Sequence, residues 1–129
     1  VCSCYSESLF MNFDTQGNSS CSEFNHQPEY LPDDAADWER MPTDSFTLST
    51  KARSADYAAN EFLPTSFSQI GGMPTWVQDS AYPSCPNCQK TMTFVAQIAN
   101  EEIEKYGEGT YFMYVCGDCN ISATNYQQT

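Results

Sequence analysis

Hydrophobic and polar residues alternate most regularly in the last third of the chain. Three runs rich in aromatic and β-branched residues there predict β-strands, over residues 92–98, 110–116 and 120–127. Strict alternation along the first run groups Phe94, Ala96 and Ile98 on one face, opposite Thr93, Val95 and Gln97. Between the first two runs, residues 101–106 predict one or two helical turns that end at the following glycines.

Upstream of residue 85 the pattern is weaker, although it still indicates short elements. We expect a strand over 8–14, a second short strand over 46–49 and a short alanine-rich helix over 51–61. Two glycines and a proline within residues 67–78 predict a turn between two extended pieces. The sequence therefore predicts a β-rich α+β fold, with an antiparallel sheet and one or two short helices.

The length of 129 residues fits one ordinary domain with one core, which we place over residues 1–129. Aromatic residues make up 14% of the chain, and this fraction argues against disorder. Within the domain, residues 1–44 form an acidic, turn-rich segment, whereas residues 68–128 carry the most specific motifs.

Charge narrows the classes of partner. Five basic residues face seventeen acidic ones, and the formal net charge is −12. Nucleic-acid binding relies on Lys and Arg to neutralise phosphates, so this balance disfavours nucleic acids, and it disfavours anionic membranes for the same reason. A basic protein or peptide is the favoured partner. Three acids near Trp38 are candidates for such docking, although a solvated loop or short helix is the simpler explanation: Asp33, Asp34 and Asp37.

The sequence also bears on location. No run of about eighteen apolar residues is found, so we expect no membrane-spanning helix. The chain starts at Val1 with neither the basic nor the apolar part of a signal peptide, and we expect a cytoplasmic protein. The missing initiator Met indicates a processed chain or a fragment of a longer product.

The strongest chemical signal is a pair of C-x-x-C motifs, formed by Cys85 with Cys88 and by Cys116 with Cys119. Two thiolates three residues apart can hold one ion if the chain curls back between them, and two such pairs are typical of a tetrahedral Zn²⁺ site. Pro86 favours the curl in the first motif. Gly117 favours it in the second, where glycine can take a positive φ.

The predicted strands bring the two motifs together. Twenty-seven residues separate them, and the strands over 92–98 and 110–116 lie in this interval. If these strands pair antiparallel, both motifs reach the same end of the sheet. Two disulfides remain an alternative in an oxidising compartment, and a redox dithiol is another, although such motifs usually begin a helix. Four cysteines leave no open coordination position, so we expect a structural and not a catalytic Zn²⁺.

A second set of candidate ligands lies near the N-terminus. Three further cysteines and the one histidine complete a tetrahedral set by number, although their spacing matches no standard template: Cys2, Cys4, Cys21 and His26. Ordinary thiols and a surface histidine explain them as well. The expected cofactor is thus one Zn²⁺, or two if this set also binds.

Catalytic motifs are weak in this sequence. A single histidine leaves little room for nucleophilic triads, and Gly71-Gly72 lacks the lysine and helix of a phosphate-binding loop. The adjacent carboxylates Glu101 and Glu102 are expected in solvent. We therefore expect a protein that is not an enzyme.

The stretch from Ser68 to Gln128 resembles a known family. It holds in order a Gly-Gly-x-Pro-x-Trp turn at residues 71–76, the first cysteine pair, a hydrophobic strand with Gln97, and the second cysteine pair. This order resembles the superfamily that joins bacterial YwqG-like proteins with the programmed cell death protein 2 group. The resemblance covers nearly half the chain and places it in the bacterial branch.

The resemblance implies a β-rich fold without known enzymatic activity. Eukaryotic members are chaperones that capture a basic ribosomal protein, and some bacterial members have been proposed as immunity proteins in toxin systems. Both roles agree with the negative charge. Aromatic anchors and amides on strands suit the capture of a basic peptide, which makes Trp76, Gln78 and Gln97 partner-binding candidates. Core packing for Trp76, and hydrogen bonds to the sheet's own loops for the two glutamines, are the simpler explanations.

Two further functions stay open at this point. The chain can be a structural lobe of a larger enzyme or complex, or a zinc ribbon that binds RNA. Five scattered basic residues argue against the second.

Overall fold

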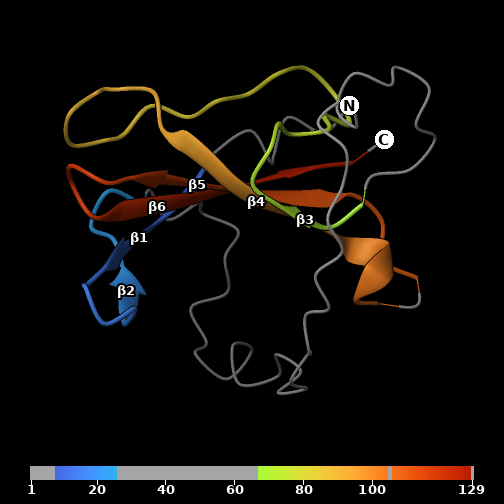
Figure 1. Ribbon diagram of the computed structural model, residues 1–129, viewed down its shortest axis with the longest axis horizontal. Helices are drawn as coiled ribbons and strands as arrows, with labels where there is room; N and C mark the ends of the chain where they lie inside the picture. Colours follow the sequence, from blue (N-terminus) through green and yellow to red (C-terminus); the bar gives the residue numbers. More distant parts are fainter. Residues whose placement is uncertain (1–7, 26–66, 105, 129) are drawn as a thin grey trace.

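A computed structural model describes residues 8–25, 67–104 and 106–128, and their strands form one antiparallel sheet (Figure 1). The strands follow the order β2-β1-β6-β5-β4-β3 across the sheet. Their bounds are β1 Leu9–Phe13, β2 Ser19–Cys21, β3 Gln69–Ile70, β4 Thr93–Ala99, β5 Thr110–Cys116 and β6 Ile121–Gln127. The predicted antiparallel sheet is confirmed.

The central strands β5 and β6 bury one face and leave the other more open. In β5 every second residue is buried, from Thr110 through Phe112 and Tyr114 to Cys116, while the residues between are less buried. In β6, Ile121 and Ala123 extend the same buried face. This alternation is the period-two pattern that the sequence predicts for a strand with one face on the core.

Strand β4 departs from the predicted alternation. Its pairing with β5 shifts register between Phe94 and Ala96, which is a β-bulge. Phe94 therefore shares a face with Gln97, because these residues pair with Tyr114 and Phe112 of β5. The prediction that Phe94, Ala96 and Ile98 share one face was wrong, since one extra residue at the bulge reverses every side chain beyond it.

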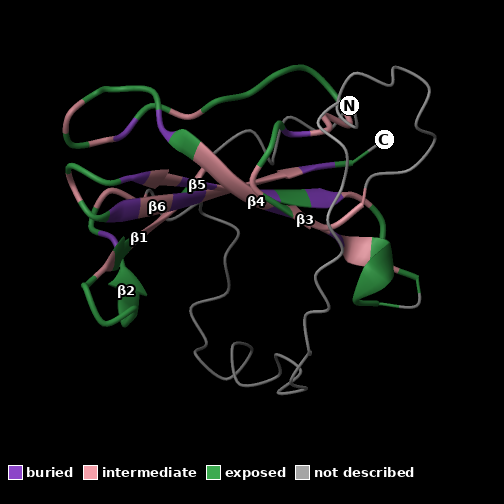
Figure 2. Ribbon diagram, viewed as in Figure 1, coloured by how far each residue is buried: buried purple, intermediate pink, exposed green. Residues whose placement is uncertain are grey.

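The segment between β3 and β4 lies along the buried face of the sheet (Figure 1). Trp76 packs against the ring of Phe112 with 4.9 Å between centroids, and it stacks on Tyr114 at 6.5 Å. Figure 2 shows the buried residues gathered in the central strands and under this segment. The core is thus a layer of aromatic and small apolar side chains between the sheet and one long connection.

Two buried glutamines fix that connection to the sheet. The Gln97 side chain accepts a hydrogen bond from the Thr75 N–H at 2.8 Å and donates one to the Phe67 carbonyl at 2.8 Å. Gln127 accepts from the N–H of Val77 and donates to the carbonyl of Asp79 at 2.8 Å. In each of these buried amides the oxygen accepts and the nitrogen donates a hydrogen bond, so no buried polar atom of the amide lacks a partner. These bonds hold the irregular backbone of the connection against the sheet.

The remaining predicted elements had mixed outcomes. The strand over 8–14 is confirmed as β1, whereas β2 was not predicted. The helix over 101–106 is instead a short 3-10 turn, η4, Asn100–Glu102. The strand over 46–49 and the helix over 51–61 lie outside the described residues. No helix in the described ranges has the length and apolar character needed to cross a bilayer.

Candidate metal centre

The two cysteine motifs form two turns, which we call knuckle 1 (residues 85–90) and knuckle 2 (residues 116–120). Knuckle 1 precedes β4, and the pairing of Ser84 with Thr91 closes its base. Knuckle 2 joins β5 to β6. Because β4 and β5 pair antiparallel, with Thr93 opposite Val115, both knuckles lie at the same end of the sheet, as the sequence predicts.

The backbone of knuckle 1 curls tightly around Cys85. The Cys85 N–H donates to the Lys90 carbonyl at 2.8 Å, and the Gln89 N–H donates to the Cys85 carbonyl at 2.8 Å. Gln89 has a φ of 61°, in the left-handed region. This conformation turns the chain back toward the start of the knuckle.

In knuckle 2 the left-handed backbone conformation occurs at a different residue than expected. Its left-handed residue is Asn120, with a φ of 54°, whereas Gly117 is not among the residues of positive φ. The expectation that Gly117 supplies a positive φ was therefore wrong. Asparagine tolerates the left-handed region better than most residues, and it carries the turn here.

The four sulfurs converge. Their Sγ atoms all lie within 4.8 Å of one another, and the Cys88 and Cys116 sulfurs are 3.7 Å apart. A tetrahedron with metal–sulfur bonds of about 2.3 Å has edges of about 3.8 Å, so this separation fits two ligands of one zinc ion. All four cysteines are free thiols and not disulfides. Cys85 and Cys116 are buried, while Cys88 and Cys119 are half-buried.

The local environment shifts the pKa values of Cys85 and Cys119 in opposite directions. Burial raises the pKa of Cys85, but hydrogen bonds from the backbone N–H groups of Cys88 and Asn87 outweigh it and lower the pKa to about 7. Burial raises the pKa of Cys119 to about 12, with Asn87 opposing the shift. Four thiolates this close cannot all ionise without a cation among them, so the donor set suits a divalent metal.

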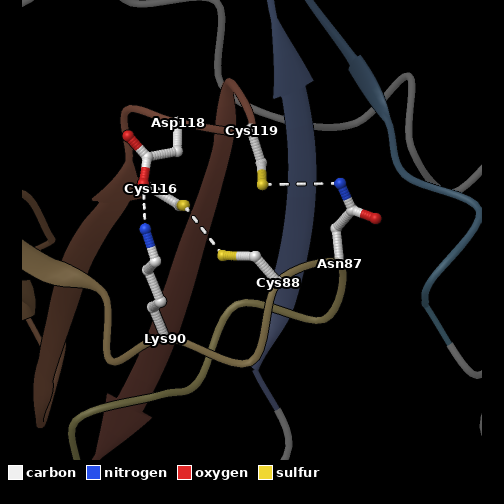
Figure 3. A network of polar contacts seen from close by, with 6 residues as sticks. All are labelled: Asn87, Cys88, Lys90, Cys116, Asp118 and Cys119. Atoms are coloured by element: carbon white, nitrogen blue, oxygen red, sulfur yellow. Dashed lines mark hydrogen bonds and ion pairs between the residues drawn. The ribbon is translucent and has the colours of Figure 1, made fainter.

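Two polar ties link the knuckles around the sulfurs (Figure 3). The Lys90 ammonium contacts the Asp118 carboxylate at 2.6 Å, and the Asn87 Nδ2 donates to the Cys119 sulfur at 3.4 Å. The ion pair raises the pKa of Lys90 and lowers that of Asp118. Sequence reasoning did not identify these roles of Asn87 and Asp118, which occupy variable positions of the motifs, or of Lys90, which lies two residues after Cys88.

The second candidate ligand set falls mostly outside the described residues, as Cys2, Cys4 and His26 do. Cys21 ends the edge strand β2, is exposed, and accepts a hydrogen bond from Asn25 Nδ2 at 3.1 Å. Within the described ranges Cys21 joins no cluster of ligands. The second metal site stays a prediction.

Only some of the candidate partner-binding residues belong to the part of the chain that the structure describes. Asp33, Asp34 and Asp37 lie outside the described residues. Trp76 packs against the core, and Gln97 is 1% exposed with both polar ends bonded to backbone. Gln78 is exposed and donates to the Gln128 carbonyl at 2.5 Å. Of the three central candidates, Gln78 is therefore the side chain most open to solvent.

A search among curated proteins adds one likeness. The chain is 42% identical, over 130 residues and 99% of its length, to a protein of Salmonella typhimurium (strain LT2) whose name is Uncharacterized protein YpfL. This chain resembles YpfL. It spans about 30% of the length of YpfL. No protein-family model matches the chain, and no solved structure matches it. The resemblance to the YwqG-like superfamily therefore stays a prediction.

Proposed function

We propose that the chain is a non-enzymatic zinc-binding module that binds a basic protein. The observation that carries the metal part is the convergence of four sulfurs from two knuckles within 4.8 Å. Zn²⁺ accepts four cysteine ligands in tetrahedral geometry, and such closed sites stabilise folds without activating water. The metal would join the segment before β4 to the turn between β5 and β6.

Elemental analysis of the purified chain tests the metal. We expect one zinc per chain, or two if Cys2, Cys4, Cys21 and His26 also bind. A Cys88→Ser, Cys119→Ser double variant should lose one zinc. A wild-type chain that holds no metal, with its thiols oxidised in pairs, would contradict the proposal and favour disulfides.

The charge supports the basic partner. The formal net charge is −12, and four thiolates around Zn²⁺ add further negative charge. In the described ranges the connection between β4 and β5 exposes the carboxylates of Glu101, Glu102, Glu104 and Glu108. Electrostatic complementarity of this kind speeds association and selects the sign of the partner. Immunity against a basic toxin and chaperoning of a basic client are two forms of this proposed role.

A matched pair of variants tests the partner. One replaces Asp33, Asp34 and Asp37 by asparagine, and the other replaces Glu101, Glu102 and Glu104 by glutamine, so both remove three charges. We expect the wild-type chain to co-purify with a basic protein whose binding weakens as salt rises. One triple variant should lose more affinity than the other and so locate the surface. Recovery of only neutral or acidic proteins would refute the role.

A second candidate function is that of a structural lobe within a longer protein. The match to YpfL favours it, because the likeness covers 99% of this chain and 30% of that relative. The intact mass of the native product separates the candidates. A mass near 14.5 kDa favours the free-standing module, and a much larger mass favours the lobe.

A further inference from the structure

The hydrogen bonds to the candidate metal ligands come from two kinds of donor, the backbone and a side chain. The Cys85 sulfur accepts from the backbone N–H groups of Asn87 and Cys88, and the Cys116 sulfur accepts from the backbone N–H of Cys119. Each of these donors belongs to the same knuckle as its sulfur. The turn itself therefore supplies them, whatever the side chains are.

The Cys119 sulfur is held differently. In the described part of the chain its donor is a side chain, the Asn87 Nδ2 at 3.4 Å, and this donor comes from the opposite knuckle. Figure 3 shows the Asn87 amide directed at the Cys119 sulfur, on the far side of the Cys88 and Cys116 sulfurs from the Lys90–Asp118 pair. A substitution at Asn87 can remove this contact without changing the backbone.

We propose that Asn87 is the positioning residue that keeps Cys119 in place as a metal ligand, through a hydrogen bond that crosses the two knuckles. The inference rests on the proposed zinc site. An N–H donor draws negative charge from a thiolate and fixes the direction of its lone pairs. Partners of this kind around metal ligands typically contribute about 10- to 100-fold in metal affinity.

Cys88 and Cys119 are the two more exposed of the four sulfurs, and of these Cys119 receives the side-chain hydrogen bond from Asn87. Cys119 is half-buried, whereas Cys85 and Cys116 are buried, so a chelator or an alkylating reagent reaches it more readily than those two sulfurs. Asn87 is exposed and contributes little to packing. Its removal should therefore loosen one ligand while leaving the fold intact.

The test uses the zinc-loaded full chain and three variants. Asn87→Ala and Asn87→Ser remove the donor, and two replacements guard against one that misfolds. Gln89→Asn is the matched control: Gln89 is exposed in the same knuckle, and its side chain donates to the Pro86 carbonyl at 3.0 Å. Asparagine also tolerates the left-handed φ at this position. Each variant is also loaded with cobalt, and its thiolate-to-cobalt charge-transfer absorption shows whether the four-cysteine site is kept.

Two measurements decide the outcome. Zinc transfer to the chromophoric chelator 4-(2-pyridylazo)resorcinol should be about tenfold faster in both Asn87 variants and unchanged in the control. Iodoacetamide labelling followed by peptide mass analysis should show Cys119 alkylated before the buried Cys85 and Cys116, and earlier in the Asn87 variants than in the wild type.

The contrary results are equally distinct. Wild-type transfer rates in both Asn87 variants, or Cys119 alkylated no earlier in them than in the wild type, would overturn this inference and leave the zinc module standing. A wild-type chain that takes up neither zinc nor cobalt would overturn the proposed function and this inference together.

Discussion

Gln89 and Asn120 occupy the same place in the two knuckles. Each directly follows the second cysteine of its motif, and each has a left-handed φ, of 61° and 54°. The knuckles come from different parts of the sheet, one before β4 and the other between β5 and β6. The two knuckles thus share one backbone conformation, a left-handed residue after the second cysteine, and each directs its two sulfurs toward the same four-sulfur cluster.

This relationship predicts which substitutions the knuckles tolerate. Asn120→Val should lower the free energy of unfolding by about 2 kcal/mol, because a β-branched residue is strained at positive φ. Asn120→Gly should change it by less than about 0.5 kcal/mol. Chemical denaturation of the zinc-loaded chain measures both.

Gly117→Ala is the control for that series. Gly117 lacks a positive φ, and a Cβ added there meets no atom within 4 Å. We expect it to be neutral, despite lying between two cysteines. Severe destabilisation by this alanine, or tolerance of valine at Asn120, would show that the left-handed residue of knuckle 2 is misassigned.

The buried amide of Gln97 should matter to stability more than its exposed counterpart Gln78. Gln97→Met retains the length of the side chain but removes its hydrogen bonds to the Thr75 N–H and the Phe67 carbonyl, at a cost of about 2 kcal/mol. Gln78→Met should cost less than about 0.5 kcal/mol because its amide is exposed. Thermal and denaturant unfolding give the comparison. Equal effects of the two substitutions would contradict the role of Gln97 in fixing the connection between β3 and β4 to the sheet.

The Lys90–Asp118 pair should favour metal retention. Lys90→Met leaves the Asp118 carboxylate uncompensated beside anionic sulfurs, so zinc affinity should fall by about two- to fivefold. Adding Asp118→Asn to Lys90→Met should recover part of this loss. Competition with a chelator at low and high salt measures it, and the difference should shrink at high salt. A double variant weaker than Lys90→Met would contradict the pairing.

The direction of the pKa shifts sets the pH window of this ion pair. The pKa of Asp118 lies below its ordinary value of 3.8, so the pair's contribution is present above that pH and is lost as the pH falls through the lowered pKa. The pKa of Lys90 lies above 10.5, so the contribution is lost only as the pH rises through the raised value. Between these limits both groups stay charged, so the coupling between Lys90→Met and Asp118→Asn in the unfolding free energy should not change with pH.

Zinc removal should unfold the knuckle end of the sheet first. Cysteine thiols must lose their protons to bind metal, so acid as well as chelators should release the ion. We expect faster hydrogen exchange in the amides of residues 85–92 and 116–121 after chelation, with a smaller change at β3. Unchanged exchange at both knuckles in the metal-free chain would show that the ion contributes little to the fold.

The sequence predicted the parts of the fold that depend on regular patterns. The strands β4, β5 and β6 are runs of seven residues that contain aromatic and β-branched side chains, and the cysteine spacing was decisive for the knuckles. Strand β2 was missed because Ser19, Ser20 and Cys21 are all exposed and carry no alternation. An edge strand of three residues exists only through its pairing with β1, which no local pattern reveals.

Other features depend on contacts between distant segments. The bulge in β4 arises from register against β5, and Gln97 faces the core because of it. The hydrogen bond from Asn87 to Cys119 joins residues 32 apart in the chain. Spacing within a C-x-x-C motif identifies the ligands, but it does not say which variable position of one motif reaches the sulfur of the other.

The strand order has a consequence for how the sheet is made. β1 pairs with β2 on one side and with β6 on the other, although β6 is the last of the described strands along the sequence. A hairpin of β1 and β2 alone is too small to be stable in water. During translation this hairpin cannot pair with β6 until residues 121–127 have been made. Completion of the sheet therefore depends on pairing between segments far apart in the sequence, which slows folding.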